Sequence, residues 1–278
     1  MPIQLFESET HASTYAQARP SPPQSLIGSI LSFLESGFPP DTNGLWPQAV
    51  DVGAGSGQTT FLMKDHFKHI LGIDISAAQI GEANKRNIYP NVSFKVSPAE
   101  TIPLENESVS LVTASQCLHW FDLEKFYTEL NRILVPGGVF ATFGYLPVPI
   151  ISTDDSSSKN KLAQLVEKCR LELSDLWEQP GTDFLNSKYT GLKLPFNDNH
   201  KINTIKCSVP YSGQKYFDYI TSWSAYNELM EKNPEKAKKF TDNIVNQLKV
   251  ILETDDVFSA QFHHEFEFFL LMSRKPEN

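Results

Sequence analysis

The chain contains few of the residues from which disulfide frameworks and zinc sites are built. Its 278 residues include three cysteines, Cys117, Cys169 and Cys207, which are odd in number and far apart in the sequence. This pattern predicts neither a disulfide framework nor a metal site. We expect reduced thiols in a cytoplasmic protein, because disulfides persist mainly in oxidising compartments.

Long apolar runs are also missing. No stretch of about 18 consecutive apolar residues occurs, which is the length that a membrane-spanning helix requires. The N-terminal segment carries Glu7 and Glu9 and contains no apolar core of the kind found in secretory signals. We therefore expect no membrane span, no membrane partner and no secretory signal.

Positive charge is scarce relative to negative charge. Lys and Arg total 24 and Asp and Glu total 33, which gives a net charge of −9. The densest basic stretch, Lys236 to Lys239, lies close to Glu231 and Glu235, as on an ordinary solvated helix face. Because binding to nucleic-acid phosphates requires a basic surface, the sequence argues against DNA or RNA as the main partner.

The first half of the chain alternates strand-like and helix-like patterns. After a helical pattern around Leu26 to Leu34, apolar runs predict strands at 48–53, 69–73, 92–96, 109–114 and 138–145, with helices at 57–67, 76–87 and 122–134. Such alternation is typical of βαβ units, so we predict an α/β fold with a parallel sheet.

The composition changes after Leu146. Proline and serine residues predict an exposed loop, followed by an amphipathic helix over 162–176 and an irregular stretch over 180–201. A strand is predicted at 202–209, and two helices broken near Pro234 are predicted over 213–252. The alternation of apolar and polar residues from Phe262 to Leu270 predicts a last strand.

Three glycines follow the first predicted strand. Gly53, Gly55 and Gly57 stand at alternate positions between an acid and a helix-like run. A strand, a tight glycine turn and a helix N-terminus form a site for a polar ligand at the carboxyl edge of a parallel sheet. A dinucleotide site would require G-x-G-x-x-G, and Gln58 stands where its third glycine would be.

An acid, Asp74, ends the next predicted strand 17 residues after Gly57. At the tip of the second strand, an acid lies where ribose hydroxyls are held by charge-assisted hydrogen bonds. The glycine turn and the strand-end acid together predict a site for a ligand that contains a ribose.

Several motifs in this half resemble a known family. Asp51–Gly57, Asp74, Pro98–Leu104 and Asn131–Gly138 follow one another in the order found in class I S-adenosylmethionine-dependent methyltransferases. Three further segments, Tyr15–Pro20, Gln116–Asp122 and Thr221–Tyr226, resemble the branch that contains trans-aconitate and cantharidin-resistance methyltransferases. The resemblance covers residues 10–145 well and 205–273 loosely, and it does not cover 146–204.

The resemblance implies a Rossmann-like fold of class I methyltransferase type. Its sheet would have seven mostly parallel strands with an antiparallel last strand, and helices would cover both faces. One domain would span 1–278: an N-terminal helical lid at 1–45, a cofactor-binding core at 46–145, an acceptor-side insertion at 146–204, and the rest of the sheet with two helices at 205–278.

The resemblance also implies S-adenosyl-L-methionine as the cofactor and assigns residues to it. These are Tyr15, Arg19, Asp51, Gly53, Ala54, Gly55, Gly57, Asp74, Ile75, Ser97, Ala99, Glu100, Ser115 and Gln116. Two positions depart from the family pattern. Pro98 replaces the acid that often precedes the alanine of the adenine segment, and the sequence after Arg19-Pro20 lacks the usual aromatic residue.

Four residues are assigned to the acceptor side: His119, Trp120, Tyr145 and Trp223. His119 is the candidate catalytic residue, as a general base for a hydroxyl substrate. The alternative is that it orients a neighbour or packs against Trp120. Methylation of a carboxylate, which is already ionised at pH 7, depends on position and desolvation more than on proton removal.

We therefore expect an enzyme that methylates a small molecule, on a carboxylate or a hydroxyl. The alternatives are methylation of a protein side chain or a small amine, and a non-enzymatic protein that binds the cofactor. The [D/N]-P-P-[Y/F] segment of many nitrogen methyltransferases is absent after the fourth strand. A nicotinamide-dependent oxidoreductase is less compatible with Gln58. The sequence predicts no oligomeric state and does not identify the acceptor.

Overall fold

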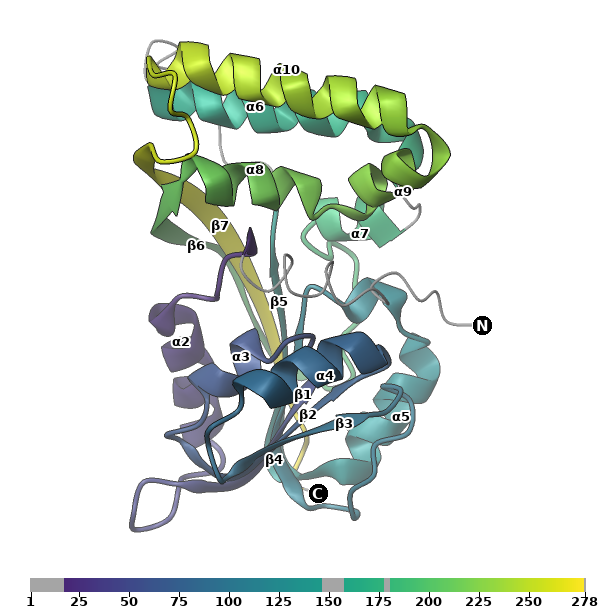
Figure 1. The fold of residues 1–278 in the computed structure, drawn as a ribbon. Helices are drawn as coiled ribbons and strands as arrows, with labels where there is room; N and C mark the ends of the chain where they lie inside the picture. Colours follow the sequence, from purple (N-terminus) through teal and green to yellow (C-terminus); the bar gives the residue numbers. More distant parts are fainter. Residues whose placement is uncertain (1–17, 147–157, 178–180, 278) are drawn as a thin grey trace.

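A computed structural model describes residues 18–146, 158–177 and 181–277, and it contains a seven-stranded sheet (Figure 1). The strands are β1 (Trp46–Val52), β2 (Phe67–Asp74), β3 (Val92–Val96), β4 (Val109–Ser115), β5 (Leu134–Tyr145), β6 (Asp198–Ser212) and β7 (Gln261–Arg274). Their order is β3-β2-β1-β4-β5-β7-β6, and β7 runs antiparallel to both of its neighbours. The predicted fold class is confirmed.

Helices cover both faces of the sheet. Those of the first half are α2 (Gln24–Glu35), α3 (Gln58–Leu62), α4 (Ala77–Arg86) and α5 (Leu123–Ile133), with a short 3-10 helix η1 (Leu118–Trp120). Those of the second half are α6 (Ser158–Glu172), α7 (Gly181–Asn186), α8 (Gly213–Thr221), α9 (Ser224–Lys232) and α10 (Pro234–Leu252), with η2 (Ser174–Leu176). None of the helices in the described ranges is long and apolar enough to cross a membrane.

Successive residues of the central strands serve two separate cores. Ala49 packs into the core that contains Leu26 and Ile30 of α2, whereas Val50 packs into the core that contains Phe126 of α5. Side chains alternate between the faces of a strand, so α2 and α5 lie on opposite faces of the sheet. The strands are buried on both faces, which explains their nearly continuous apolar sequences.

The helices α6, α8, α9 and α10 gather at one end of the molecule, above β6 and β7, and we call them the helical cap (Figure 1). The interior of the cap is aromatic: Tyr216, Tyr219 and Trp223 are fully buried. The hydroxyl group of Tyr216 donates to the backbone oxygen of Leu162 at 2.5 Å, which ties α8 to α6. The cap therefore packs as one unit with the first core.

Two boundaries in the first half differ from the prediction. The helix expected over 57–67 ends at Leu62. The strand expected from residue 138 begins at Leu134, which pairs with Val109. The Gly137 N–H donates to the backbone oxygen of Lys275 at 3.0 Å, so a segment distant in sequence keeps residues 134–138 extended.

In the second half of the chain, the observed helices and strands depart further from the predicted ones. Within 180–201, where irregular structure was expected, lie α7 and the start of β6, and β6 extends beyond the predicted 202–209 because its pairing with β7 reaches Ser212. The two helices predicted over 213–252 are three, since a break at Ser222–Trp223 accompanies the one before Pro234. The Ser222 hydroxyl donates to the Tyr219 oxygen at 2.7 Å and helps to end α8.

Candidate functional site

The glycine turn, residues 53–57, lies between β1 and α3. Gly53, Gly55 and Gly57 have φ values of +64°, +55° and +87°, a region that favours glycine. A Cβ on Gly53 would lie 2.6 Å from the Sγ atom of Cys117, and a Cβ on Gly57 would lie 2.8 Å from the rings of Phe61 and Phe94. Any side chain at these two positions would therefore strain or displace the turn.

Asp74 connects the glycine turn to the end of β2. Its Oδ2 atom accepts from the Gly55 N–H at 2.9 Å, and its Oδ1 atom accepts from the Ser76 N–H at 2.9 Å. Ser76 in turn caps α4. A carboxylate has about four acceptor positions, more than these two N–H groups occupy. Asp74 and the following Ile75 are half-buried.

Asp51 is almost fully buried at the end of β1. Its carboxylate accepts from the Thr60 hydroxyl at 2.6 Å and from the Thr113 hydroxyl at 2.8 Å. Burial raises the pKa of Asp51 to about 6, although both hydrogen bonds act in the opposite direction. These contacts fasten β1 to α3 and β4. The assignment of Asp51 to the cofactor remains a prediction.

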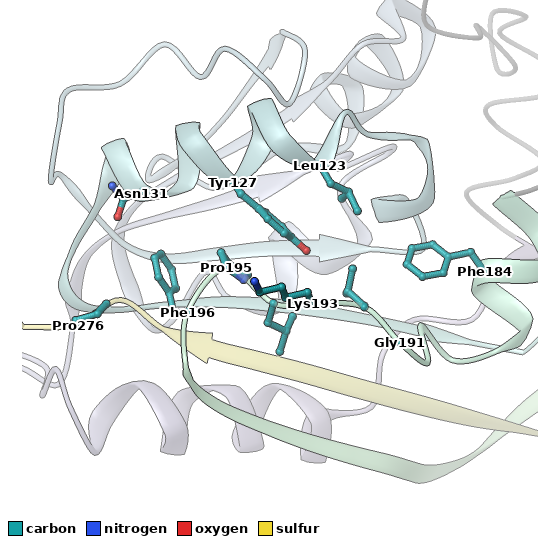
Figure 2. A pocket seen from close by; sticks show the side chains of 11 residues that line it. Leu123, Tyr127, Asn131, Phe184, Gly191, Lys193, Pro195, Phe196 and Pro276 are labelled. Atoms are coloured by element: carbon teal, nitrogen blue, oxygen red, sulfur yellow. The ribbon is translucent and has the colours of Figure 1, made fainter.

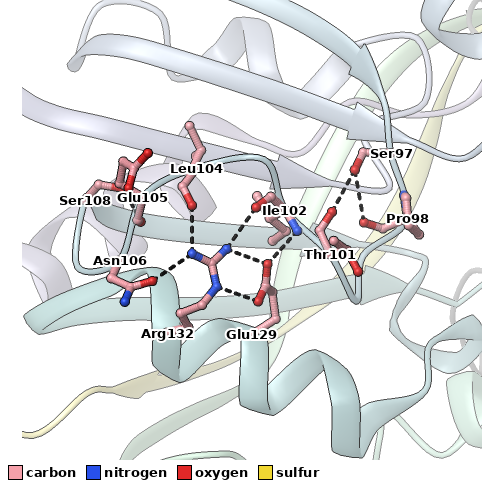
Figure 3. A network of polar contacts seen from close by, with 10 residues as sticks. All are labelled: Ser97, Pro98, Thr101, Ile102, Leu104, Glu105, Asn106, Ser108, Glu129 and Arg132. Atoms are coloured by element: carbon pink, nitrogen blue, oxygen red, sulfur yellow. Dashed lines mark hydrogen bonds and ion pairs between the residues drawn. The ribbon is translucent and has the colours of Figure 1, made fainter.

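Residues 97–104, which contain Ser97, Ala99 and Glu100, form a loop that α5 holds in place (Figure 3). Arg132 donates to the backbone oxygens of Ile102 at 2.9 Å and Leu104 at 2.8 Å. Glu129 accepts from the Ile102 N–H at 2.6 Å and pairs with Arg132 at 2.7 Å. Figure 3 shows both side chains reaching from the helix to the loop backbone. The Asn131–Gly138 motif therefore contributes Arg132 to the support of this loop.

The loop is also tied to the strand ends. The Ser97 N–H donates to the Asp74 backbone oxygen at 3.0 Å, and the Ser97 hydroxyl donates to the Thr101 oxygen at 2.8 Å. Glu100 accepts from the Asp122 N–H at 3.0 Å, and Ala99 is buried in the second core. Ser97 therefore lies beside Asp74, and the assignment of these three residues to the cofactor remains a prediction.

Ser115 ends β4, and Gln116 follows with a left-handed backbone at φ +57°. The Gln116 side chain donates to the Tyr145 oxygen at 3.1 Å and accepts from the Tyr145 N–H at 3.2 Å, which continues the β4–β5 pairing with a side chain. A non-glycine residue in this conformation costs about 1–2 kcal/mol. Such strain is concentrated at functional sites.

Arg19 joins the N-terminal segment to the helical cap. Its Nε atom donates to the Ser222 hydroxyl at 3.1 Å, one terminal nitrogen donates to the Tyr145 hydroxyl at 3.2 Å, and its guanidinium lies 5.4 Å from the Tyr219 ring centroid. The Gln58 side chain donates to the Arg19 oxygen at 3.3 Å. This cation therefore lies between the glycine turn and the cap. Tyr15 lies outside the described residues.

His119 lies on η1, next to the end of β4. Its Nδ1 atom is 3.0 Å from the hydroxyl of Tyr189, and its ring centroid is 4.8 Å from that of Trp120. Burial lowers the pKa of His119 to about 4, whereas Trp120 is 40% exposed. Tyr189 was not among the site residues predicted from the sequence, because it belongs to the 146–204 segment, where no family motif matches.

The two remaining acceptor-side predictions are buried aromatic residues. Tyr145 packs on Phe266 and Phe268 of β7 with centroid distances of 5.4 and 5.3 Å. Trp223 is fully buried, and its ring centroid lies 5.4 Å from that of Trp177 inside the cap. Tyr145 contacts Arg19 directly, whereas the Trp223 ring packs against that of Tyr219 at a centroid distance of 5.7 Å. Their contact with an acceptor remains a prediction.

A cavity of about 670 Å³ lies elsewhere, along α5 (Figure 2). Figure 2 shows Tyr127 reaching from α5 toward a segment that includes Gly191 and Lys193. The lining residues are Leu123, Tyr127, Asn131, Phe184, Gly191, Leu192, Lys193, Leu194, Pro195, Phe196 and Pro276. None of the predicted site residues that the structure describes is among them, so this cavity is distinct from the glycine turn.

The surroundings of the glycine turn fit a polar ligand. The Oε1 atom of Gln79 is buried and has no hydrogen-bond partner among the described residues, and it lies 3.7 Å from the Cβ position of Gly55. A buried acceptor without a donor is costly unless a ligand or water supplies one. Within the described ranges, no group of three or more His, Cys, Asp or Glu residues could hold a metal ion.

Comparisons with known proteins agree with this geometry. Residues 50–142 match the family model of a methyltransferase domain. A methyltransferase of Dictyostelium discoideum is 31% identical over 229 residues, which cover 82% of each chain. CRG1 of Saccharomyces cerevisiae, named as a probable S-adenosylmethionine-dependent methyltransferase, is 25% identical over 95% of each chain.

The fold has a solved counterpart in a protein of Anaeromyxobacter dehalogenans, reported as a type II methyltransferase. That structure has a TM-score of 0.73 and 23% sequence identity, and the alignment covers 93% of this chain and 99% of the other. It supports the fold alone. The sequence relatives and the geometry of the glycine turn together lead to one conclusion: the chain belongs to the family of S-adenosylmethionine-dependent methyltransferases.

Proposed function

We propose that the enzyme methylates a carboxylate of a small organic molecule. One observation carries the proposal: His119, the titratable side chain predicted for the acceptor side, is half-buried beside Tyr189, and burial lowers its pKa to about 4. Such an imidazole is neutral at pH 7 and is a weak base. It suits an acceptor that needs no proton removed, and a carboxylate is such an acceptor.

The magnitude of this pKa shift favours a carboxylate acceptor over a hydroxyl acceptor. A phenol has a pKa near 10. Transfer of its proton to a base whose conjugate acid has a pKa of about 4 is unfavourable by roughly 8 kcal/mol, at about 1.4 kcal/mol for each pKa unit. For a carboxylate this cost is absent. Alignment of the two reactants alone can then supply roughly 7–11 kcal/mol of the barrier reduction.

The cofactor would lie along the carboxyl ends of β1, β2 and β4. S-adenosylmethionine supplies an electrophilic methyl group on a sulfonium sulfur. The backbone of Gly53–Gly57 would hold its amino-acid part, Asp74 would accept from the ribose hydroxyls, and the 97–104 loop would lie along the adenine. This placement rests on the positive φ values of the turn and on the position of Asp74 beside it.

The acceptor would bind between this edge and the helical cap. We extend the role of Arg19, which the resemblance assigns to the cofactor, to the carboxylate of the acceptor, because its guanidinium is held next to Tyr145 and Ser222, beyond the end of β5. The Gln116–Asp122 segment, which resembles trans-aconitate and cantharidin-resistance methyltransferases, supports the same substrate class. We keep the N-terminal lid at 1–45, the cofactor-binding core at 46–145 and the acceptor-side insertion at 146–204. His119, Trp120 and Tyr145 of the core and Trp223 of 205–278 would also face the acceptor.

A methyl-transfer screen tests the proposal. The enzyme is incubated with methyl-labelled S-adenosylmethionine and matched sets of carboxylic acids, phenols and amines. We expect label in products that release methanol on mild alkaline treatment, as methyl esters do. Transfer to phenols or amines with none to acids would contradict a carboxylate acceptor and would leave the family assignment intact.

A further inference from the structure

Tyr189 contributes a fixed hydroxyl group to the predicted acceptor side. It is 1% exposed, and its ring lies 4.9 Å from that of Phe184 and 5.3 Å, edge to face, from that of Phe269. Lys188 and Tyr189 follow α7 with φ values of +53° and +54°, and the Tyr189 N–H donates to the Phe184 oxygen at 3.1 Å. Two consecutive non-glycine residues in this conformation are costly, so packing must hold them there.

The burial of the phenol indicates the direction of its proton. Burial raises the pKa of Tyr189 well above its usual value, so the phenol keeps its proton. A buried O–H group without an acceptor is costly, so this donor requires a hydrogen-bond partner. The Nδ1 atom of His119 lies 3.0 Å away and is the acceptor in reach.

We propose that Tyr189 donates to Nδ1 of His119 and thereby fixes the tautomer that carries its proton on Nε2. His119 then presents a hydrogen-bond donor, not a base, to the acceptor molecule. Tyr189 is a positioning residue, because it acts through His119. The identity of the acceptor oxygen rests on the proposed function, whereas the tautomer is a property of the protein alone.

Nitrogen NMR of the full-length protein tests the tautomer directly. The sequence has seven histidines, so the His119 ring signals are assigned by their loss in H119Q. In the wild type we expect Nε2 to carry the proton and Nδ1 to carry none. In Y189F, which lacks the hydroxyl group, we expect a mixture of the two tautomers.

Tyr127 provides the matched control. Its hydroxyl group is also buried but has no hydrogen-bond partner among the described residues, so Y127F should leave the His119 signals unchanged. A proton on Nδ1 in the wild type, or an unchanged tautomer in Y189F, would overturn the proposal. The wild-type measurement decides even where Y189F does not fold, and it requires no acceptor, so it stands apart from the methyl-transfer screen.

Kinetics of His119 variants separate a donor from a base. The amide of glutamine places an N–H group near the position of Nε2 but cannot act as a base. With the preferred acceptor, we expect H119A to lose about tenfold in kcat/KM, the scale of one hydrogen bond, and H119Q to recover most of that loss. A loss in H119Q as large as in H119A, reaching about a thousandfold, would show that His119 removes a proton.

Discussion

The two sides of the proposed site are built in different ways. On the cofactor side, the contacts join residues close in sequence and use backbone groups: the Gly55 N–H bonds to Asp74, 19 residues later. On the acceptor side, they join side chains far apart: Arg19 bonds to Ser222 across 203 residues. A backbone site tolerates few substitutions, whereas a side-chain site can change its specificity through residues scattered along the chain.

The largest effect is expected at Gly53, where the cofactor side depends on backbone shape. G53A places a Cβ at positive φ and against Cys117, so we expect about 2–4 kcal/mol of destabilisation and more than tenfold weaker binding of adenosylhomocysteine. Urea unfolding and calorimetry measure the two effects. Gly28 of α2 has open space around its Cβ position, so G28A should gain about 0.5–1 kcal/mol. If G53A bound adenosylhomocysteine with the affinity of the wild type, the cofactor side would not depend on the backbone shape of the turn.

The next effect concerns Asp74. D74A should weaken adenosylhomocysteine binding by roughly 1.5–3 kcal/mol, the scale of hydrogen bonds to a charged group. Asp41 is a matched control, because it also accepts from two backbone N–H groups, at 2.8 and 3.1 Å, but in a turn before β1. D41A should lower the unfolding free energy and leave affinity unchanged. Equal affinities of D74A and D41A by calorimetry would remove Asp74 from the cofactor site.

A smaller effect tests whether α5 supports the cofactor side. R132A removes the donors to Ile102 and Leu104 and leaves Glu129 without its ion-pair partner, so we expect a loss of about 1–3 kcal/mol in unfolding free energy and weaker cofactor binding. The Arg170–Glu167 pair of α6 has the same i,i+3 spacing, and among the described residues the Arg170 side chain bonds to Glu167 and to no loop backbone.

R170A should therefore cost less than about 1 kcal/mol, as partly exposed pairs do, and should leave cofactor affinity unchanged. Both variants are compared by urea unfolding at one salt concentration. Equal losses of unfolding free energy in R132A and R170A would mean that the contacts of Arg132 with the 97–104 loop contribute no stability beyond that of the ion pair.

The smallest effect is a pH dependence from Asp51. Because burial raises its folded pKa from 3.8 to about 6, its stabilising contribution is complete below pH 4 and is lost as pH rises to about 6. D51N has no such ionisation. The unfolding free energy of D51N relative to wild type should therefore rise by up to about 2 kcal/mol between pH 4 and pH 7. If the difference in unfolding free energy between D51N and wild type were the same at pH 4 and pH 7, burial would not raise the pKa of Asp51.

The geometry of the glycine turn and the position of Asp74 could be predicted from the sequence because their signals are local. The spacing of Gly53, Gly55 and Gly57 matches their positive φ values, and Asp74 was expected at the strand end where it lies. The mostly parallel sheet with an antiparallel last strand was also expected, and the structure confirms it. Such features depend on the chain within one or two elements.

The acceptor side could not be predicted because its contacts depend on tertiary packing. Tyr189 meets His119 across 70 residues, in a conformation that usually favours glycine, and no pattern around Tyr189 signals it. The break at Ser222 was missed for a related reason, since that residue ends α8 while its side chain and backbone oxygen accept from Arg19. Helix propensity alone does not report such contacts.

A crystal structure of the enzyme with adenosylhomocysteine tests the central claim most directly. We expect the ribose hydroxyls within hydrogen-bond distance of Asp74, the amino-acid part against the backbone of Gly53–Gly57, and the sulfur facing the end of β4 near Gln116. Adenosylhomocysteine bound instead in the cavity along α5, with the glycine turn making no contact to it, would contradict the account.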